Sequence, residues 1–279
     1  MKTVSATSIQ DYRKCPRFYK YRYVDRLKVP PSPNMVSGSV VHRVIEDWLG
    51  ENIDRSIPVE AYVQGLLIME FGHHDDAWGQ AKKYLPGVMR ALSKVPEWVW
   101  ERTWHVEQLM EWEYRDVCCA GCMGTGTGTA HTPVCKAVTV RMKPDLWSEH
   151  DSIIDIVEFK TTERNPLDYL LFNPQHWYYG VALAQEHPDT FIRFRYVCLP
   201  TTTKRAVEHI PWAFTVNALA QAREELVQGA TNTGSADWRN RGFWCSTCEF
   251  KELCAVALTG GDEEGMIEEM KEASSVSAR

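Results

Sequence analysis

Two carboxylates and a lysine near the middle of the chain have the types and spacing to act on a phosphate ester. Pro144-Asp145 is followed, after twelve residues, by Glu158-Phe159-Lys160. Asp145 and Glu158 offer the oxygen ligands that Mg²⁺ and Mn²⁺ prefer. Such an ion polarises a phosphoryl oxygen and lowers the pKa of an attacking water, and a lysine beside it can orient that water. The pattern therefore indicates metal-assisted cleavage of a phosphodiester.

The segment around Glu158 predicts a buried strand. Residues 152–160 are mostly β-branched and apolar, and charges appear in such a strand only when they are paired or bind metal. Glu158 and Lys160 are two positions apart, so they project from the same face. A bare PD…ExK pattern recurs by chance, but this buried setting favours a site over two solvated strand ends.

Two predicted helices add polar residues at a spacing of one turn. Residues 38–49 have the apolar stripe of a helix. His42 and Glu46 are one turn apart, so they share a face of this helix. A second helix is expected to begin at Pro174, with Gln175 and Tyr179 on one face. Taken alone, a helical histidine is more often a packing residue than a ligand.

The order GxxxH, PD, ExK and QxxxY resembles the PD-(D/E)xK nuclease superfamily, in particular its RecB-like and Cas4-like branch. The resemblance implies an α/β, restriction-endonuclease-like core, with a central mixed β-sheet flanked by helices and a helical N-terminal region. It implies a metal site made of His42, Asp145, Glu158 and the Phe159 carbonyl, holding Mg²⁺ or Mn²⁺. It also implies that the catalytic set comprises Asp145, Glu158, Lys160, Gln175 and Tyr179, the last two orienting substrate or Lys160.

The cysteines suggest a second metal centre. Of the nine cysteines, four, called here the terminal cysteines, lie near the two chain ends: Cys15, Cys245, Cys248 and Cys254. We expect a reducing compartment, the cytoplasm of a bacterial or phage-infected cell, because no signal peptide or membrane-length apolar run of about 20 residues is present. Four thiolates suit either zinc or a [4Fe–4S] cluster. The family resemblance implies the iron–sulfur cluster, as a staple that joins the N- and C-terminal ends.

A further cysteine group falls in residues 118–135, where CxxCxGxG is followed by a histidine and a cysteine. We interpret it as an inserted hairpin tip that holds Zn²⁺ in a small knuckle; the alternative is an unmetallated Gly/Thr-rich loop. The candidate ligands are Cys119, Cys122, His131 and Cys135, with Cys118 as a substitute. Cys198 is expected to be a buried apolar residue.

Basic and aromatic residues alternate near the N-terminus and are candidates for binding single-stranded DNA. An ordinary amphipathic segment with core aromatics is an equal alternative. The net charge of −6 is uneven, since residues 262–279 hold six acidic and two basic side chains. We predict one nuclease domain over residues 1–261, followed by an acidic mobile tail over 262–279. The candidate DNA-binding residues are Arg13, Lys14, Arg17, Tyr19 and Lys20.

The periodicity predicts helices up to Trp98, with a break or kink at Pro86, and then a strand-rich block. Expected strands cover residues 106–117, 136–146, 153–160, 190–199 and 204–210; expected helices cover 174–186 and 216–228.

The resemblance implies a metal-dependent DNA nuclease, and we expect an exonuclease that acts on single-stranded or frayed DNA ends. No GxxxxGK[ST] motif is present, so a helicase or recombination protein would act in trans, and no membrane partner is expected. The alternatives are an endonuclease or end-trimming partner with the same site, a non-catalytic DNA-binding module, and an iron–sulfur redox protein. The intact Asp145, Glu158 and Lys160 set disfavours the binding module, and the lack of a dinucleotide fingerprint disfavours the redox protein.

Overall fold

The structure is a computed structural model that describes residues 2–54, 56–72, 74–114, 138–162, 175–232 and 242–276. Its contacts divide the chain into two compact units. The terminal unit consists of Met1–Pro30, Glu111–Arg141 and Arg223–Arg279, and the central unit consists of Pro31–Met110 and Met142–Ala222. The predicted single domain over residues 1–261 thus contains segments of both units.

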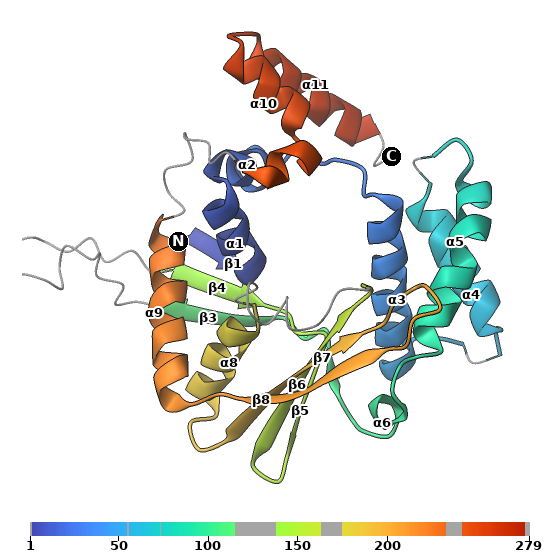
Figure 1. The fold of residues 1–279 in the computed structure, drawn as a ribbon, viewed down its shortest axis with the longest axis vertical. Helices are drawn as coiled ribbons and strands as arrows, with labels where there is room; N and C mark the ends of the chain where they lie inside the picture. The colour runs from blue at the N-terminus through green and yellow to red at the C-terminus, as the bar shows by residue number, and fades with distance from the viewer. Residues whose placement is uncertain are drawn as a thin grey trace, which may run out of the picture. The chain divides into compact units, whose positions relative to one another are not determined.

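The central unit contains a five-stranded sheet in the order β2-β5-β6-β7-β8 (Figure 1). β6 and β7 are parallel, and the other neighbours are antiparallel. The parallel pair requires a crossover, and this crossover contains helix α8 (Gln175–Glu186). The strands are β2 (His105–Val106), β5 (Leu146–His150), β6 (Ile153–Lys160), β7 (Phe191–Cys198) and β8 (Val207–Ala213).

Both faces of β6 are covered, which explains its nearly continuous run of buried residues. Val157 and Phe159 belong to the core that also contains residues of α3, α4 and α5. Glu158 points to the other face, together with its register partner Tyr196. On that face His176 of α8 lies with its ring 6.0 Å from the Tyr196 ring.

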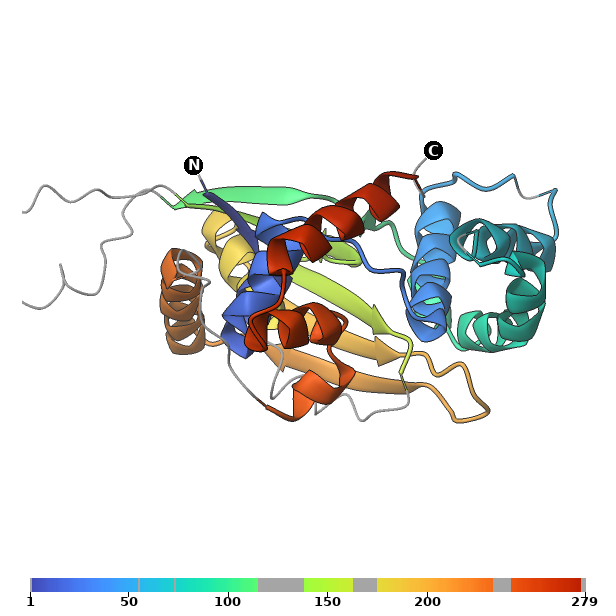
Figure 2. The ribbon, with the colours of Figure 1, turned by 90° about the horizontal axis from the view of Figure 1, so that it is seen from above.

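Three helices of the central unit pack side by side (Figures 1 and 2). α3 begins with Pro33 at its first turn, where the missing N–H costs nothing, after the N-cap Ser32. α5 continues through Pro86, so of the two predicted outcomes the break does not occur, and the kink stays a prediction. The helices are α3 (Pro33–Leu49), α4 (Val59–Glu70) and α5 (Ala77–Leu92), followed by the short α6 (Glu97–Trp100).

The terminal unit contains a three-stranded sheet in the order β1-β4-β3, with β1 parallel to β4. A reciprocal capping box between Ser5 and Ser8 begins the first helix. Cys15 ends that helix, and Pro16 begins the next one. The elements are β1 (Lys2–Ser5), α1 (Ala6–Lys14), α2 (Pro16–Tyr19), the π-helix η1 (Lys20–Val24), β3 (Met110–Tyr114) and β4 (Val138–Met142).

The C-terminal elements of the terminal unit share a small core with its N-terminal helices, beside which they lie in both views (Figures 1 and 2). The shared core includes Phe18, Tyr21 and Phe250. The C-terminal elements are η2 (Phe243–Thr247), α10 (Lys251–Leu258) and α11 (Glu263–Val276). Helix α9 (Val216–Asn232) precedes them and begins in the central unit.

The structure differs from the expected elements in two further places. Residues 263–276 form α11, in which Ile267 is buried in the small core and Glu263 pairs with Arg17; the mobility of this tail stays a prediction. The strands predicted at 106–117 and 136–146 are each divided between the two sheets. Glu107 has a left-handed φ of 48° that ends β2, and Pro144 cannot donate a ladder hydrogen bond.

Candidate active site

A tight hairpin brings the two predicted carboxylates together. His150 of β5 lies opposite Ile153 of β6, and only Asp151 and Ser152 join the strands. Both have left-handed backbones, with φ of 49° and 60°, as a type I′ turn requires. This turn sets Leu146 opposite Val157. One residue further along the same register, Asp145 comes opposite Glu158, so the twelve-residue spacing follows from hairpin geometry.

Helix α3 places His42 against Asp145. Nδ1 of His42 lies 3.1 Å from Oδ1 of Asp145, while the Phe159 N–H donates a hydrogen bond of 2.6 Å to Oδ2. A glycine four residues before the histidine allows the close approach: a Cβ on Gly38 would lie 2.7 Å from Oγ1 of Thr161. The GxxxH pattern thus has a steric reason in this chain.

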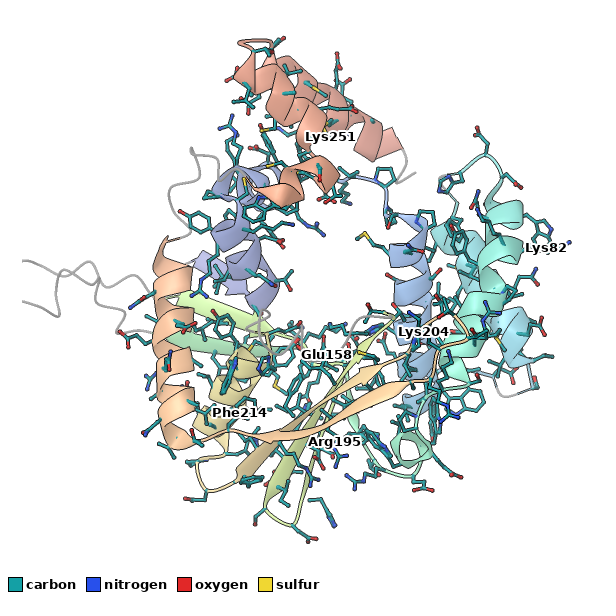
Figure 3. All side chains as sticks on the ribbon, viewed as in Figure 1. Lys82, Glu158, Arg195, Lys204, Phe214 and Lys251 are labelled. Atoms are coloured by element: carbon teal, nitrogen blue, oxygen red, sulfur yellow. The ribbon has the colours of Figure 1, made fainter. Side chains whose placement is uncertain are left out.

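Glu158, Lys160, Gln175 and Tyr179 also meet in the structure. Oε1 of Glu158 accepts hydrogen bonds from Nζ of Lys160 at 2.6 Å and from Nε2 of Gln175 at 3.0 Å. The Tyr179 hydroxyl accepts from Gln175 and donates to the Lys143 carbonyl at 3.0 Å. Glu158 is only 3% exposed, and among the described residues its Oε2 has no hydrogen-bond partner. Figure 3 labels Glu158.

The buried charges shift one another's pKa values. Burial would raise the pKa of Asp145, but the charge and hydrogen bond of His42, with help from Lys160, outweigh it and lower that pKa. Burial would lower the pKa of His42, but Asp145 outweighs it and raises that pKa. Burial and then the charge of Asp145 raise the pKa of Glu158 to about 7. The site therefore has an excess of carboxylates, which a divalent cation would neutralise.

One further carboxylate belongs to this site and has no motif in the sequence. Ligand atoms of His42, Glu107 and Asp145 all lie within 4.8 Å of one another, the only such group of three among the described residues. The set differs from the predicted one, because Glu158 lies outside it and Glu107 lies within it. Glu107 follows an edge strand paired with β5, and this pairing of distant segments leaves no local signal. The predicted ligand role of the Phe159 carbonyl stays a prediction.

The terminal cysteines line a single cavity of about 300 Å³ in the terminal unit. None of these four residues forms a disulfide, so all four thiols are available as ligands. Phe18, Tyr21 and Phe250 also line the cavity. Burial raises the pKa of Cys248, and a bound metal would reverse that effect. The predicted zinc residues 118–135 lie outside the described residues.

Most of the N-terminal aromatic residues belong to the core. Tyr19 is 5% exposed and packs edge-on against Tyr12 at 5.5 Å, which agrees with the alternative of core aromatics. Arg17 pairs with Glu263, and Nζ of Lys20 lies 2.8 Å from Asp25. Arg13 donates to the Glu225 carbonyl, and Lys14 lies over the Phe18 ring. Binding of DNA by these basic residues stays a prediction.

The fold and the site define a mixed α/β protein with two sheets flanked by helices, consistent with a restriction-endonuclease-like fold, and a candidate acidic metal site. Residues 3–255 match the family model described as "PD-(D/E)XK nuclease superfamily". The chain therefore belongs to the PD-(D/E)XK nuclease superfamily, which implies a metal-dependent nuclease.

Other comparisons add little. A solved structure titled "Crystal structure of SSO0001" is similar over 91% of this chain and 86% of that chain, at 14% identity and a TM-score of 0.42. That similarity is too low to support an argument. None of the curated proteins compared with the chain matches it. Within the described residues, no helix is both long and apolar enough to cross a membrane.

Proposed function

We propose that the protein is a Mg²⁺- or Mn²⁺-dependent deoxyribonuclease that acts as an exonuclease on single-stranded or frayed DNA ends. The main support is the convergence of His42, Asp145, Glu158 and Lys160 around one end of the β5–β6 hairpin. A buried carboxylate oxygen without a partner among the described residues, Oε2 of Glu158, is costly unless a cation or a proton compensates it. The donor set of carboxylate oxygens and one imidazole fits a divalent ion.

The residues have separate roles in this proposal. A bound divalent ion supplies Lewis-acid activation of the phosphoryl oxygen and of the attacking water. His42, Asp145 and Oε2 of Glu158 would hold the ion, while Oε1 of Glu158 fixes the Lys160 ammonium beside it. Gln175 and Tyr179 keep Glu158 in place and join it to the backbone at Lys143. Lys160 would orient the water and stabilise the charge that develops on the phosphate.

We also propose that the terminal cysteines hold a [4Fe–4S] cluster. Tetrahedral zinc with bonds of about 2.3 Å brings its sulfur ligands to roughly 3.8 Å from one another. No three Sγ atoms of the described cysteines lie within 4.8 Å of one another, although all four residues line one cavity. A four-iron cluster, whose iron atoms stand between the thiolates, suits this wider spacing. A reducing cytoplasm would keep these thiols free of disulfides.

Purified protein with end-labelled linear and with circular single-stranded DNA tests the activity. An exonuclease with Mn²⁺ should degrade the linear strand to short products and leave the circle intact, and chelation should stop the reaction. Cutting of the circle would replace the proposal by the endonuclease alternative. No cleavage of either DNA by iron-loaded protein would contradict the nuclease itself, and the non-catalytic DNA-binding module would then take its place.

The proposal includes a preference for single-stranded or frayed ends, which a helicase or recombination protein acting in trans would supply. Duplexes with blunt ends and with single-stranded tails separate the two substrates. We expect faster release of label from the tailed duplex. Equal rates would remove the single-strand preference and leave the nuclease assignment unaffected.

A further inference from the structure

Glu107 is fixed beside the candidate metal ligands by the backbone. β2 pairs with β5 through His105 with Trp147 and Val106 with Leu146, so the next position brings Glu107 alongside Asp145. The Glu107 N–H donates a hydrogen bond of 2.9 Å to the Asp145 carbonyl. The side chain therefore starts from a fixed point next to the metal site.

The backbone of Glu107 is in an uncommon conformation. Its φ of 48° lies in the left-handed region, which residues with a Cβ adopt at a cost in energy. Such residues gather at functional sites, where the surrounding structure holds them in place. In this conformation a carboxylate oxygen of Glu107 comes within 4.8 Å of the ligand atoms of His42 and Asp145.

A neighbouring lysine holds the other oxygen of Glu107. Oε2 of Glu107 pairs with Nζ of Lys143, and the backbone carbonyl of Lys143 accepts the hydrogen bond from Tyr179. Lys143 is 49% exposed, whereas Glu107 is 18% exposed. The carboxylate is thus the less exposed member of the pair, and the lysine can turn toward solvent at little cost.

Like charges surround Glu107. The carboxylate of Asp145 lies close to that of Glu107, and the ammonium of Lys143 pairs with Glu107. One monovalent ammonium is therefore set against two neighbouring carboxylates. A divalent cation between Glu107 and Asp145 would relieve this repulsion more effectively than Lys143 does.

We propose that Glu107 is a ligand of the divalent ion, together with His42 and Asp145, and that Lys143 is the counter-ion that Glu107 exchanges for that ion. This proposal rests on the proposed function, since it concerns the same site. An independent observation points to a cation there: the nearby Glu158 is almost wholly buried, and its Oε2 has no hydrogen-bond partner among the described residues.

Metal affinity separates a ligand from a structural ion pair. Mn²⁺ binding to purified protein, followed by calorimetry and by the electron paramagnetic resonance of free Mn²⁺, should weaken at least about tenfold in Glu107→Gln. Lys143→Met should bind Mn²⁺ several-fold more tightly, because the competing ammonium is gone. Glu111→Gln, which removes the carboxylate of the Glu111–Arg141 pair in the terminal unit, is the matched control and should bind like wild type.

Other results of the Mn²⁺-binding experiment would contradict different parts of the proposal. Equal weakening in Glu107→Gln and Lys143→Met would show that the pair is structural and would overturn the proposal. Wild-type affinity in Glu107→Gln, with affinity lost in Asp145→Asn, would overturn the role of Glu107 and leave the nuclease site in place. Unchanged affinity in Asp145→Asn as well would contradict the metal site of the proposed function.

Discussion

The hairpin site and the cysteine cavity are assembled in different ways. At the hairpin, the strand register and hydrogen bonds to neighbouring residues position Asp145 and Glu158. In the cavity, Cys15 and Cys254 come from segments far apart in the chain, and the small core that they adjoin is aromatic and apolar. We therefore expect a metal ion at the hairpin to take part in catalysis, and a metal centre at the cavity to stabilise the fold.

The largest effect should come from removing Lys160 or the carboxylate of Asp145. Lys160→Ala and Asp145→Asn should lower the rate of metal-dependent DNA cleavage by at least about a thousandfold, because both act at the scissile phosphate. Their thermal unfolding and iron content should stay near wild type. Lys204→Ala, at an exposed position of the central unit, is the control. Wild-type cleavage by either variant would remove the active-site assignment.

The second effect concerns the stability that a metal centre at the cysteine cavity would give the fold. Anaerobically purified protein should be brown, and Cys248→Ala should lose the colour, iron and acid-labile sulfide, with a loss of several kcal/mol in unfolding free energy. Cys198→Ala, which alters a cysteine buried in β7 of the central unit, should keep its iron. A colourless wild-type protein with one zinc at the terminal cysteines would replace the cluster by zinc.

A third, smaller effect concerns pH and the buried Glu158. Burial and the charge of Asp145 raise its pKa from 4.5 to about 7 in the metal-free protein. Between these values the folded protein keeps a proton that the unfolded chain releases, so stability present below pH 4.5 is lost as the pH rises through about 7. The loss is at most about 3 kcal/mol.

Glu158→Gln cannot ionise and should remove this pH dependence. Urea unfolding in EDTA at pH 5 and pH 8 measures it, and the variant should gain stability relative to wild type at the higher pH. Glu60→Gln, at an exposed position in α4, should follow wild type. Parallel pH curves for Glu158→Gln and wild type would contradict the raised pKa.

The smallest effect tests the turn that sets the register. Ser152 has a φ of 60°, where glycine fits without a Cβ penalty, so Ser152→Gly should stabilise the protein by about 1 kcal/mol. Thr203→Gly, at an exposed bend of the central unit without positive φ, should not stabilise it. Thermal unfolding measures both, and a destabilised Ser152→Gly would argue against the type I′ turn.

Local patterns predicted the parts of the site that lie close together in sequence. The spacing of Asp145 and Glu158 fits a hairpin with a two-residue turn, and the interval from Gly38 to His42 fits one turn of α3. The apolar stripe of α3 and the buried strand β6 were predictable from the sequence for the same reason, because helical and strand periodicities repeat within a few residues. Residues 118–135, with the proposed zinc ligands, lie outside the described residues.

Long-range pairing decided the rest. Glu107 reaches the site because β2 pairs with β5 across an intervening segment that contributes β3 and β4 to the other sheet. Tyr19 became a core residue because Tyr12 and Tyr23 pack against it. Ile267 of α11 is buried because distant segments of the chain form an apolar core around it. By itself, the sequence determined the residues whose geometry follows from local backbone periods, whereas the tertiary structure decided which distant segments share a surface, since burial and strand pairing join residues without any fixed spacing.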